Sequence, residues 1–113
     1  MSIQNISLFK VFIRSDSWEY YDHDRRCYWS FYAPGARYIR LQLDLFKSYD
    51  SNDRLYVYLG TSSGSYLWHY FYGDSWEDGG TWDLETDMLY LYWYTNGCCD
   101  RELGWHGYVI RQG

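Results

Sequence analysis

Residues 37–46 have the sequence RYIRLQLDLF, in which apolar and polar side chains alternate. Ile39, Leu41 and Leu43 occupy every second position, and Arg40 and Gln42 occupy the positions between them. Two residues is the period of a β-strand, whose successive side chains point to opposite faces. The stretch therefore predicts a strand with one face in a core and the other toward water.

The same period recurs along the chain, between turn residues such as Pro34-Gly35 and Ser62-Ser63-Gly64. Further strands are predicted at 8–13, 27–32, 54–60, 65–72, 81–84, 88–95 and 104–111. No segment sustains the spacing of an amphipathic helix. Short strands with one apolar face must bury it against a second sheet. We therefore expect an all-β fold, a two-sheet antiparallel β-sandwich or jelly roll, with residues 1–113 forming a single domain.

Composition agrees with this class, because 15 Tyr, 7 Trp and 5 Phe make the chain 24% aromatic, and aromatic residues favour strands. A net charge of −5 argues against nucleic acid as a partner, since phosphate binding needs clustered Lys and Arg. No apolar run reaches the roughly 20 residues of a membrane span. The predicted core comprises Trp29, Phe31, Ile39, Leu41, Leu43, Leu55, Val57, Leu59, Leu67, Phe71, Leu89, Leu91, Trp93, Trp105 and Val109.

Four segments follow one another in the chain: 27–31 (CYWSF), Pro34-Gly35 with 38–43 (YIRLQL), 52–60 (NDRLYVYLG), and 88–96 followed by 104–108 (GWHGY). In this order they resemble the pattern of the CUB domain family. The resemblance covers most of the chain and implies a CUB-like jelly roll that binds protein or glycan ligands.

The chain departs from the family in its cysteines. Cys27 matches one family cysteine, but the usual disulfide partners are absent. Many CUB domains are extracellular, and related CUB-like domains without disulfides occur in cytosolic proteins. We therefore expect an extracellular or cell-surface location if the chain is part of a larger protein, and a cytosolic one if it is complete.

The resemblance also implies a calcium site, because many CUB domains bind Ca²⁺ with carboxylates from two loops at one end. Asp53 matches the family's first-loop aspartate and Asn96 its second-loop aspartate, and Asp50 is a further ligand candidate. Nearby carboxylates are Asp44 and Asp100. Calcium takes six to eight oxygen ligands. The alternative is that Asp50, Asn52 and Asp53 only cap a turn.

A face rich in tyrosine is the second candidate site. Tyr56 and Tyr58 alternate with predicted core residues on one strand. On the predicted strand at 88–95, Tyr90, Tyr92 and Tyr94 alternate with core residues in the same way. The candidate ligand-binding residues on these strands are Tyr56, Tyr58, Tyr90, Tyr92 and Tyr94, with Tyr28 and Tyr32 on a third strand. Tyrosines stack against sugar rings and anchor protein interfaces, but they are also favoured on half-exposed strands. We expect Tyr90, Tyr92 and Tyr94 to contribute to binding rather than to stability.

Two loops add smaller candidates. Trp76 stands among carboxylates in 73–80 (GDSWEDGG), where it would contact a ligand or fold back over the core. Cys98 and Cys99 are adjacent. They would form a vicinal disulfide, bridge to Cys27 or remain thiols, and sequence does not decide among these.

No catalytic motif is present, since His23, His69 and His106 are isolated and no nucleophile or phosphate-loop signature occurs. The sequence therefore predicts a non-catalytic binding module that recognises carbohydrate or a cell-surface ligand, with or without Ca²⁺. The alternative is a protein-interaction or self-assembly domain, including a homo-oligomer, that uses the tyrosine-rich face.

Overall fold

The computed structural model describes the backbone of residues 3–5 and residues 10–15, 26–48, 52–73, 78–95 and 104–112. These residues form strands and the turns between them. The strands are β1 (Ile3–Asn5), β2 (Val11–Arg14), β3 (Arg26–Tyr32), β4 (Tyr38–Lys47), β5 (Arg54–Leu59), β6 (Tyr66–Tyr72), β7 (Gly80–Leu84), β8 (Met88–Tyr94) and β9 (Gly104–Gln112).

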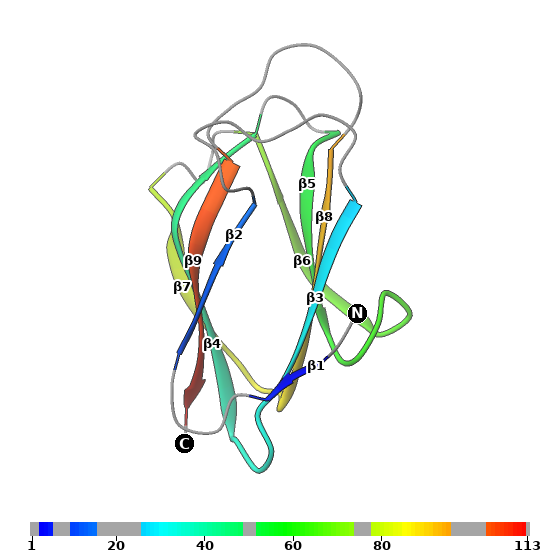
Figure 1. Cartoon of the computed structure of the whole chain (residues 1–113), viewed down its shortest axis with the longest axis vertical. Coiled ribbons are helices and arrows are strands. Elements are labelled where there is room, and N and C mark those ends of the chain that lie inside the picture. Colours follow the sequence, from blue (N-terminus) through cyan, green and yellow to red (C-terminus); the bar gives the residue numbers. More distant parts are fainter. Residues whose placement is uncertain are drawn as a thin grey trace.

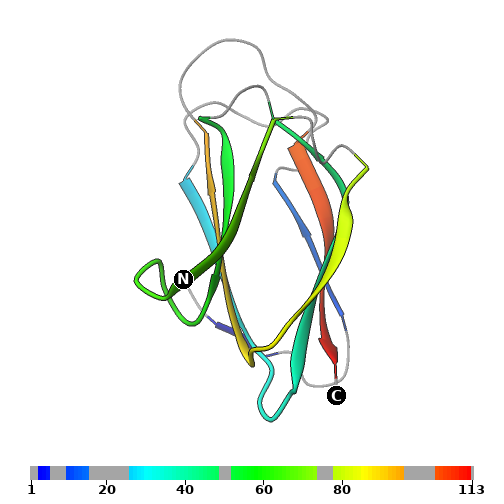
Figure 2. The same cartoon turned by 180° about the vertical axis from the view of Figure 1, so that it is seen from behind.

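The strands lie in two layers that face each other (Figures 1 and 2). One sheet has five strands in the order β1-β3-β8-β5-β6, and the other has four in the order β2-β9-β4-β7. All pairings are antiparallel except β1 with β3, which is parallel. The predicted all-β, two-sheet sandwich is therefore confirmed, with one parallel edge strand added.

Strand positions follow the alternation in the sequence. On β8 the residues are alternately half-buried and buried, with Leu89, Leu91 and Trp93 inside. Every predicted strand is found within a few residues of its expected bounds. Sequence analysis did not predict β1, because three residues are too few to establish a period of two.

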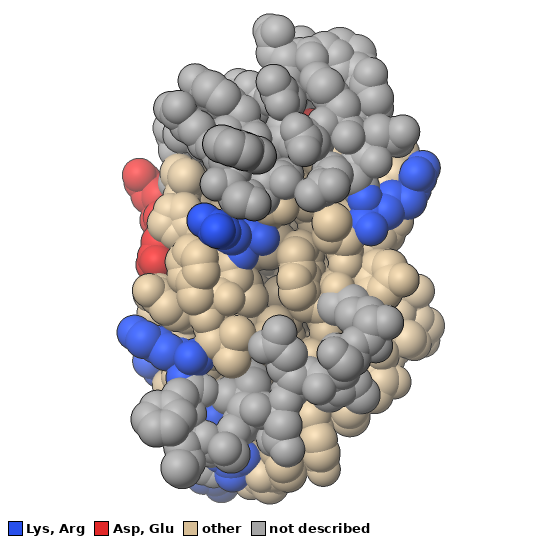
Figure 3. Space-filling model, in the orientation of Figure 1, with Lys and Arg blue, Asp and Glu red and all other residues tan. Residues whose placement is uncertain are grey.

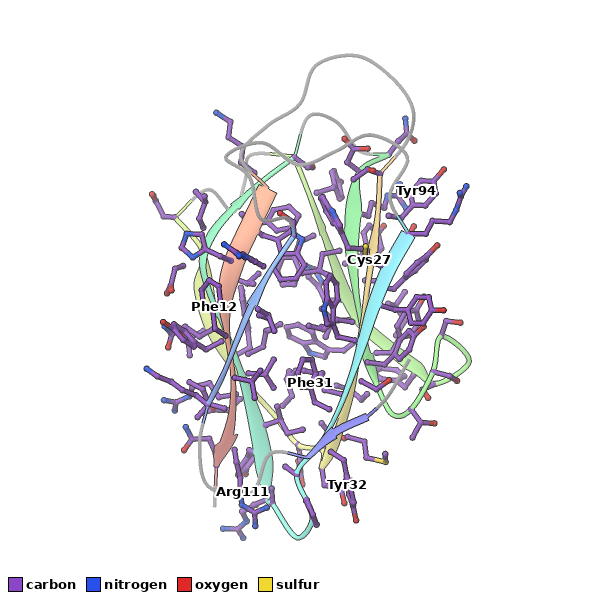
Figure 4. The ribbon with its side chains drawn as sticks, viewed as in Figure 1. Phe12, Cys27, Phe31, Tyr32, Tyr94 and Arg111 are labelled. Atoms are coloured by element: carbon purple, nitrogen blue, oxygen red, sulfur yellow. The ribbon has the colours of Figure 1, made fainter. Side chains whose placement is uncertain are left out.

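Apolar side chains from both sheets fill the space between the layers, as Phe31 does in Figure 4. The largest side chains of this core are aromatic. The ring centroid of Phe46 lies 6.1 Å from that of Trp93 and 5.8 Å from that of Phe71. Most of the predicted core is buried. Buried residues that the prediction lacked are Ile13, Ala33, Phe46 and Leu84.

One predicted core residue is wrong. Leu67 is 38% exposed, because the register between β5 and β6 shifts after the pair Val57–His69, so that Tyr58 pairs with Leu67. The shift leaves Trp68 as an extra residue on β6. A β-bulge of this kind changes which face the following residues occupy. Leu67 therefore lies on the outer side, although Phe71 on the same strand is buried.

The described residues contain no helix. Accordingly, the part of the chain seen in the structure holds no helix that is long and apolar enough to cross a membrane.

Candidate functional site

One row of four tyrosines crosses the five-stranded sheet. Tyr28 pairs with Tyr92, Tyr92 with Tyr56, and Tyr56 with Tyr70, so β3, β8, β5 and β6 each contribute one. The next row includes Tyr90 and Tyr58. With Tyr94 and Tyr72 beside them, these side chains form what we call the tyrosine face. Its tyrosines are Tyr28, Tyr56, Tyr58, Tyr70, Tyr72, Tyr90, Tyr92 and Tyr94.

The tyrosine face lies on the outside of the sandwich, because the alternate residues of the same strands are in the core. Leu55, Val57, Leu91 and Trp93 are each fully buried. Figure 4 shows Tyr94 on the outer side of the five-stranded sheet and Phe31 between the sheets. The predicted tyrosines of β5 and β8 therefore share one surface, as the sequence analysis proposed.

Neighbouring rings on this face stack against one another. Tyr56 and Tyr92 have centroids 5.9 Å apart with planes at 22°, and Tyr28 and Tyr90 lie 6.0 Å apart, also at 22°. Tyr56 and Tyr58 form a similar pair at 6.3 Å and 21°. Pairs at these centroid distances lie within the range over which aromatic rings interact. The tyrosine rings therefore form one continuous layer of contacts across β3, β8 and β5.

Two arginines join the tyrosines at one end of the face. Arg26 and Arg54 both pair with Tyr94, from opposite sides, and Arg54 also pairs with Tyr72. The Arg26 guanidinium lies 5.2 Å from the Tyr94 ring centroid, and that of Arg54 lies 4.8 Å from Tyr70. These are cation–π distances, so both guanidiniums are held close to the ring surface.

Burial among the rings changes the acidity of two phenols. Burial, followed by the negative charges that Tyr56 and Tyr92 would carry when ionised, raises the pKa of Tyr58. The pKa of Tyr90 is raised in the same way, by burial and then by Tyr28, Tyr92 and Tyr58. Both groups are therefore neutral hydroxyls near neutral pH, able to donate one hydrogen bond each.

Tyr70, Tyr72, Arg26 and Arg54 are part of this surface, but the sequence analysis did not nominate them. A usable signal was present: Tyr70 and Tyr72 follow Tyr56 and Tyr58 across the predicted turn at Ser62-Ser63-Gly64. Pairing the two strands of that hairpin would have placed these tyrosines side by side.

Asp53 lies at the other candidate site, directly before β5. It is 1% exposed. Arg54 pairs with Tyr94, so the antiparallel register places Asp53 next to Thr95, which is also fully buried. Thr95 directly precedes Asn96 in the sequence.

The other expected calcium ligands, Asp50 and Asn96, lie outside the described residues. The same is true of Asp100, Trp76, Cys98 and Cys99. Asp44 lies on β4, where its carboxylate accepts a hydrogen bond of 2.9 Å from the Gln42 side chain. Within the described ranges, no group of three His, Cys, Asp or Glu side chains is placed to hold a metal. Asp53 is thus the one expected ligand whose position is known.

Cys27 lies on β3 as a half-buried free thiol. Its side chain is labelled in Figure 4 and packs against the core.

Comparison by sequence finds nothing: no family model matches the chain, and no curated protein does. Comparison by structure finds similar folds. The full extracellular region of zebrafish Gpr126/Adgrg6 matches over 96% of this chain with 18% identity and a TM-score of 0.76. The CUB1-EGF-CUB2 domains of rat MASP-1 match over 97% with 11% identity and a TM-score of 0.74.

A single isolated domain also matches. The MASP-1 CUB2 domain bound to Ca²⁺ aligns with 95% of this chain at 14% identity and a TM-score of 0.75. This chain spans 96% of that domain, but 14% of the zebrafish structure and 42% of the rat one. The fold of this protein is therefore CUB-like, in agreement with the resemblance seen in the sequence.

Proposed function

We propose that the chain is a non-catalytic recognition module, formed by residues 1–113 as one domain, that binds a protein ligand through the tyrosine face. The observation that carries the proposal is the row of Tyr28, Tyr92, Tyr56 and Tyr70 across four neighbouring strands. Tyrosine gives a large contact area at a small cost in side-chain entropy, and it is enriched where proteins bind other proteins.

The tyrosine face suits two other ligands as well. A sugar stacks its C–H groups on aromatic rings and accepts hydrogen bonds from phenol hydroxyls, so carbohydrate binding is the second candidate. Self-assembly of the chain through the same face is the third.

Fold similarity supports the same class of function and an extracellular location. The similar structures include the extracellular region of a zebrafish protein and CUB domains of MASP-1.

A calcium ion near Asp53 is a further part of the proposal. Asp53 is a buried carboxylate directly before β5, beside the buried Thr95, and carboxylate oxygens are ligands that Ca²⁺ prefers. One of the similar structures is bound to Ca²⁺. In this chain Asp53 would supply one ligand, with Asp50 and Asn96 as the proposed others.

The test of the tyrosine face is binding to arrays of extracellular protein domains and of glycans. The variant is the double substitution Tyr56→Ser and Tyr92→Ser, and the control is Tyr38→Ser with Tyr108→Ser on the other sheet. We expect binding on the protein array that the first variant loses and the control keeps.

The other outcomes identify the other candidates. Signals on the glycan array alone would favour carbohydrate. Binding that survives in the Tyr56→Ser and Tyr92→Ser variant would exclude the tyrosine face. A mass in solution that rises with concentration, and that this variant abolishes, would favour self-assembly.

A further inference from the structure

Strand β6 forms one edge of the five-stranded sheet, since it stands at the end of the strand order β1-β3-β8-β5-β6. Figure 2 looks onto this side of the sandwich, with β6 in green and β7 in yellow at the front. An edge strand presents backbone N–H and C=O groups in the direction in which a further strand would add. Such an edge is a template for pairing with another chain.

β6 is also the most exposed strand among those whose side chains are described. Five of its seven residues are exposed, whereas every residue of β8 is half-buried or buried. The exposed ones include four large hydrophobic side chains, Tyr66, Leu67, Tyr70 and Tyr72. Solvent therefore reaches a strand that is mostly apolar, and exposed apolar surface of this kind marks interaction sites.

The four edge strands of the two described sheets differ in their protection. Natural proteins discourage pairing at an edge by keeping it short or by placing charge on it. β1 has three residues, β2 carries Arg14 and β7 carries Asp83. β6 has the sequence YLWHYFY, with no Lys, Arg, Asp, Glu or Pro. Figure 3 shows tan atoms along the right margin, at the height where the turn 60–65 between β5 and β6 lies in Figure 1. β6 is therefore the edge least protected by charge or by shortness.

We propose that β6 is a self-association edge, at which two copies of this chain pair antiparallel around a two-fold axis and join their five-stranded sheets. Charge selects a second copy as the occupant. Two identical strands that carry charge bring like charges together when they pair, which is destabilising, and β6 carries none. The net charge of −5 opposes close approach of two copies, so a long strand without charge is where they meet at least cost. This edge is distinct from the tyrosine face, and the proposal goes beyond the function proposed above.

A bulge limits the part of β6 that can pair. The register with β5 is regular from Arg54–Tyr72 to Val57–His69 and shifts after that pair. Bulges interrupt pairing along an edge, so we place the contact between the two copies at 69–72. In this stretch His69, Tyr70 and Tyr72 are exposed. Cross-strand contacts of their rings add to the backbone hydrogen bonds of the new ladder.

The experiment measures the mass of the chain in solution by sedimentation equilibrium over a range of concentrations, for the wild type and three lysine variants. His69 pairs with the buried Val57, so His69→Lys places an inward-pointing charge on the edge, which is a natural way of blocking strand pairing. Leu67→Lys is a second variant, at an exposed residue on the outer side of β6. The control is Phe12→Lys, which adds the same charge at an exposed residue of another edge strand, β2. Near-ultraviolet circular dichroism establishes that each variant is folded.

We expect the wild-type mass to rise with concentration to twice that of the chain and no further, because a two-fold contact closes on itself. Both β6 variants should raise the dissociation constant of the dimer at least about tenfold, with the control unchanged. Added salt should strengthen the dimer, since it screens the repulsion between two acidic chains. A chain that stays monomeric at millimolar concentration, or a dimer that His69→Lys and Leu67→Lys both leave intact, overturns the proposal.

Backbone hydrogen exchange locates the contact. The amides of 69–72 should exchange more slowly at concentrations that favour the dimer than at dilution, and those of β2 and β7 should exchange equally in both. Protection of β2 or β7 with no change in β6 would place the interface on a different edge and refute this one.

The double variant Tyr56→Ser with Tyr92→Ser keeps this proposal separate from the proposed function. The edge dimer should survive in this variant, and His69→Lys should retain binding on the protein array. A dimer that the double variant abolishes and His69→Lys preserves would refute the edge and favour self-assembly through the tyrosine face. Binding on the protein array that the double variant does not weaken would refute the proposed function and leave the edge dimer standing.

Discussion

Tyr56 and Tyr92 lie opposite each other on β5 and β8, with ring centroids 5.9 Å apart and ring planes at 22°. The Tyr56 ring also contacts Tyr70, and the Tyr92 ring also contacts Tyr28. The four rings support one another before any ligand is bound. A surface preorganised in this way loses less entropy on binding than one whose side chains are mobile.

Stacking on the tyrosine face changes the effect on stability expected from the sequence. Tyr92 is half-buried against Tyr28 and Tyr56, so Tyr92→Ala should lower the free energy of unfolding by about 1 kcal/mol. Leu91→Ala on the same strand should cost about 2–5 kcal/mol, because Leu91 is fully buried and its loss leaves a cavity. Denaturant unfolding measures both.

The control for this pair is Tyr66→Ala, because Tyr66 is 69% exposed and should change stability by less than about 0.5 kcal/mol. If Tyr92→Ala costs as much as Leu91→Ala, another part of the chain must cover the tyrosine face.

Alkaline pH should destabilise the protein through Tyr58 and Tyr90. Burial raises the pKa of both phenols above the ordinary value for tyrosine of about 10. Since the folded state then holds protons that the unfolded state has lost, the stabilisation is fully present below about pH 10 and is lost as the pH rises through the folded pKa.

Ultraviolet titration of the phenolates tests this assignment. The folded chain should show tyrosines that ionise later than those of the chain in guanidinium chloride, and Tyr58→Phe with Tyr90→Phe should remove the late part of the curve. Superimposable curves for the folded and denatured chains would contradict the packing of these rings.

Calcium should raise the melting temperature if Asp53 is a ligand. A ligand that binds only the folded state stabilises it by about 2.7 kcal/mol at a concentration of one hundred times its Kd. Asp53→Asn should abolish the rise. The matched control is Asp83→Asn, an exposed carboxylate on the other sheet that pairs with Arg40, and it should leave the calcium effect intact. A wild-type melting temperature that millimolar Ca²⁺ does not change would remove calcium from the account.

Close contact between β4 and β9 depends on Gly107. A Cβ atom at this position would lie 1.8 Å from the backbone oxygen of Gln42, and that oxygen cannot move without shifting β4. Gly107→Ala should therefore lower the free energy of unfolding by about 3 kcal/mol, measured by denaturant titration. Gly64→Ala is the control, since its nearest atom is Ser62 Oγ at 3.5 Å. Equal effects of the two substitutions would contradict the pairing of β4 with β9.

Most of the fold follows from the period of the sequence, because alternation fixes both the strand and its buried face. The residues 38–43 and 88–93 have no competing pattern, and both are found as predicted. The failure at Leu67 has a physical cause: an extra residue at Trp68 breaks the alternation, and a bulge depends on contacts with the neighbouring strand that a single strand's sequence does not contain.

The candidate site was predicted in part for a related reason. The alternation in the sequence predicted that Tyr56, Tyr58, Tyr90 and Tyr92 lie on the outer faces of their strands. Only the strand order of the sheet shows that β5 lies beside β8. Strand order depends on long-range pairing, as does the position of Arg26 and Arg54 on either side of Tyr94. The angles between the rings depend on rotamers that only the packed structure determines.

Hydroxyl-radical footprinting of the chain alone and in complex with a protein ligand tests the central claim most directly. Among the exposed rings, Tyr28, Tyr70 and Tyr72 are 45%, 38% and 43% exposed on the tyrosine face, and Phe12 is 49% exposed on the opposite sheet. The account predicts that the ligand protects Tyr28, Tyr70 and Tyr72 from oxidation and leaves Phe12 as reactive as before. Protection of Phe12 with unchanged oxidation of the three tyrosines would contradict it.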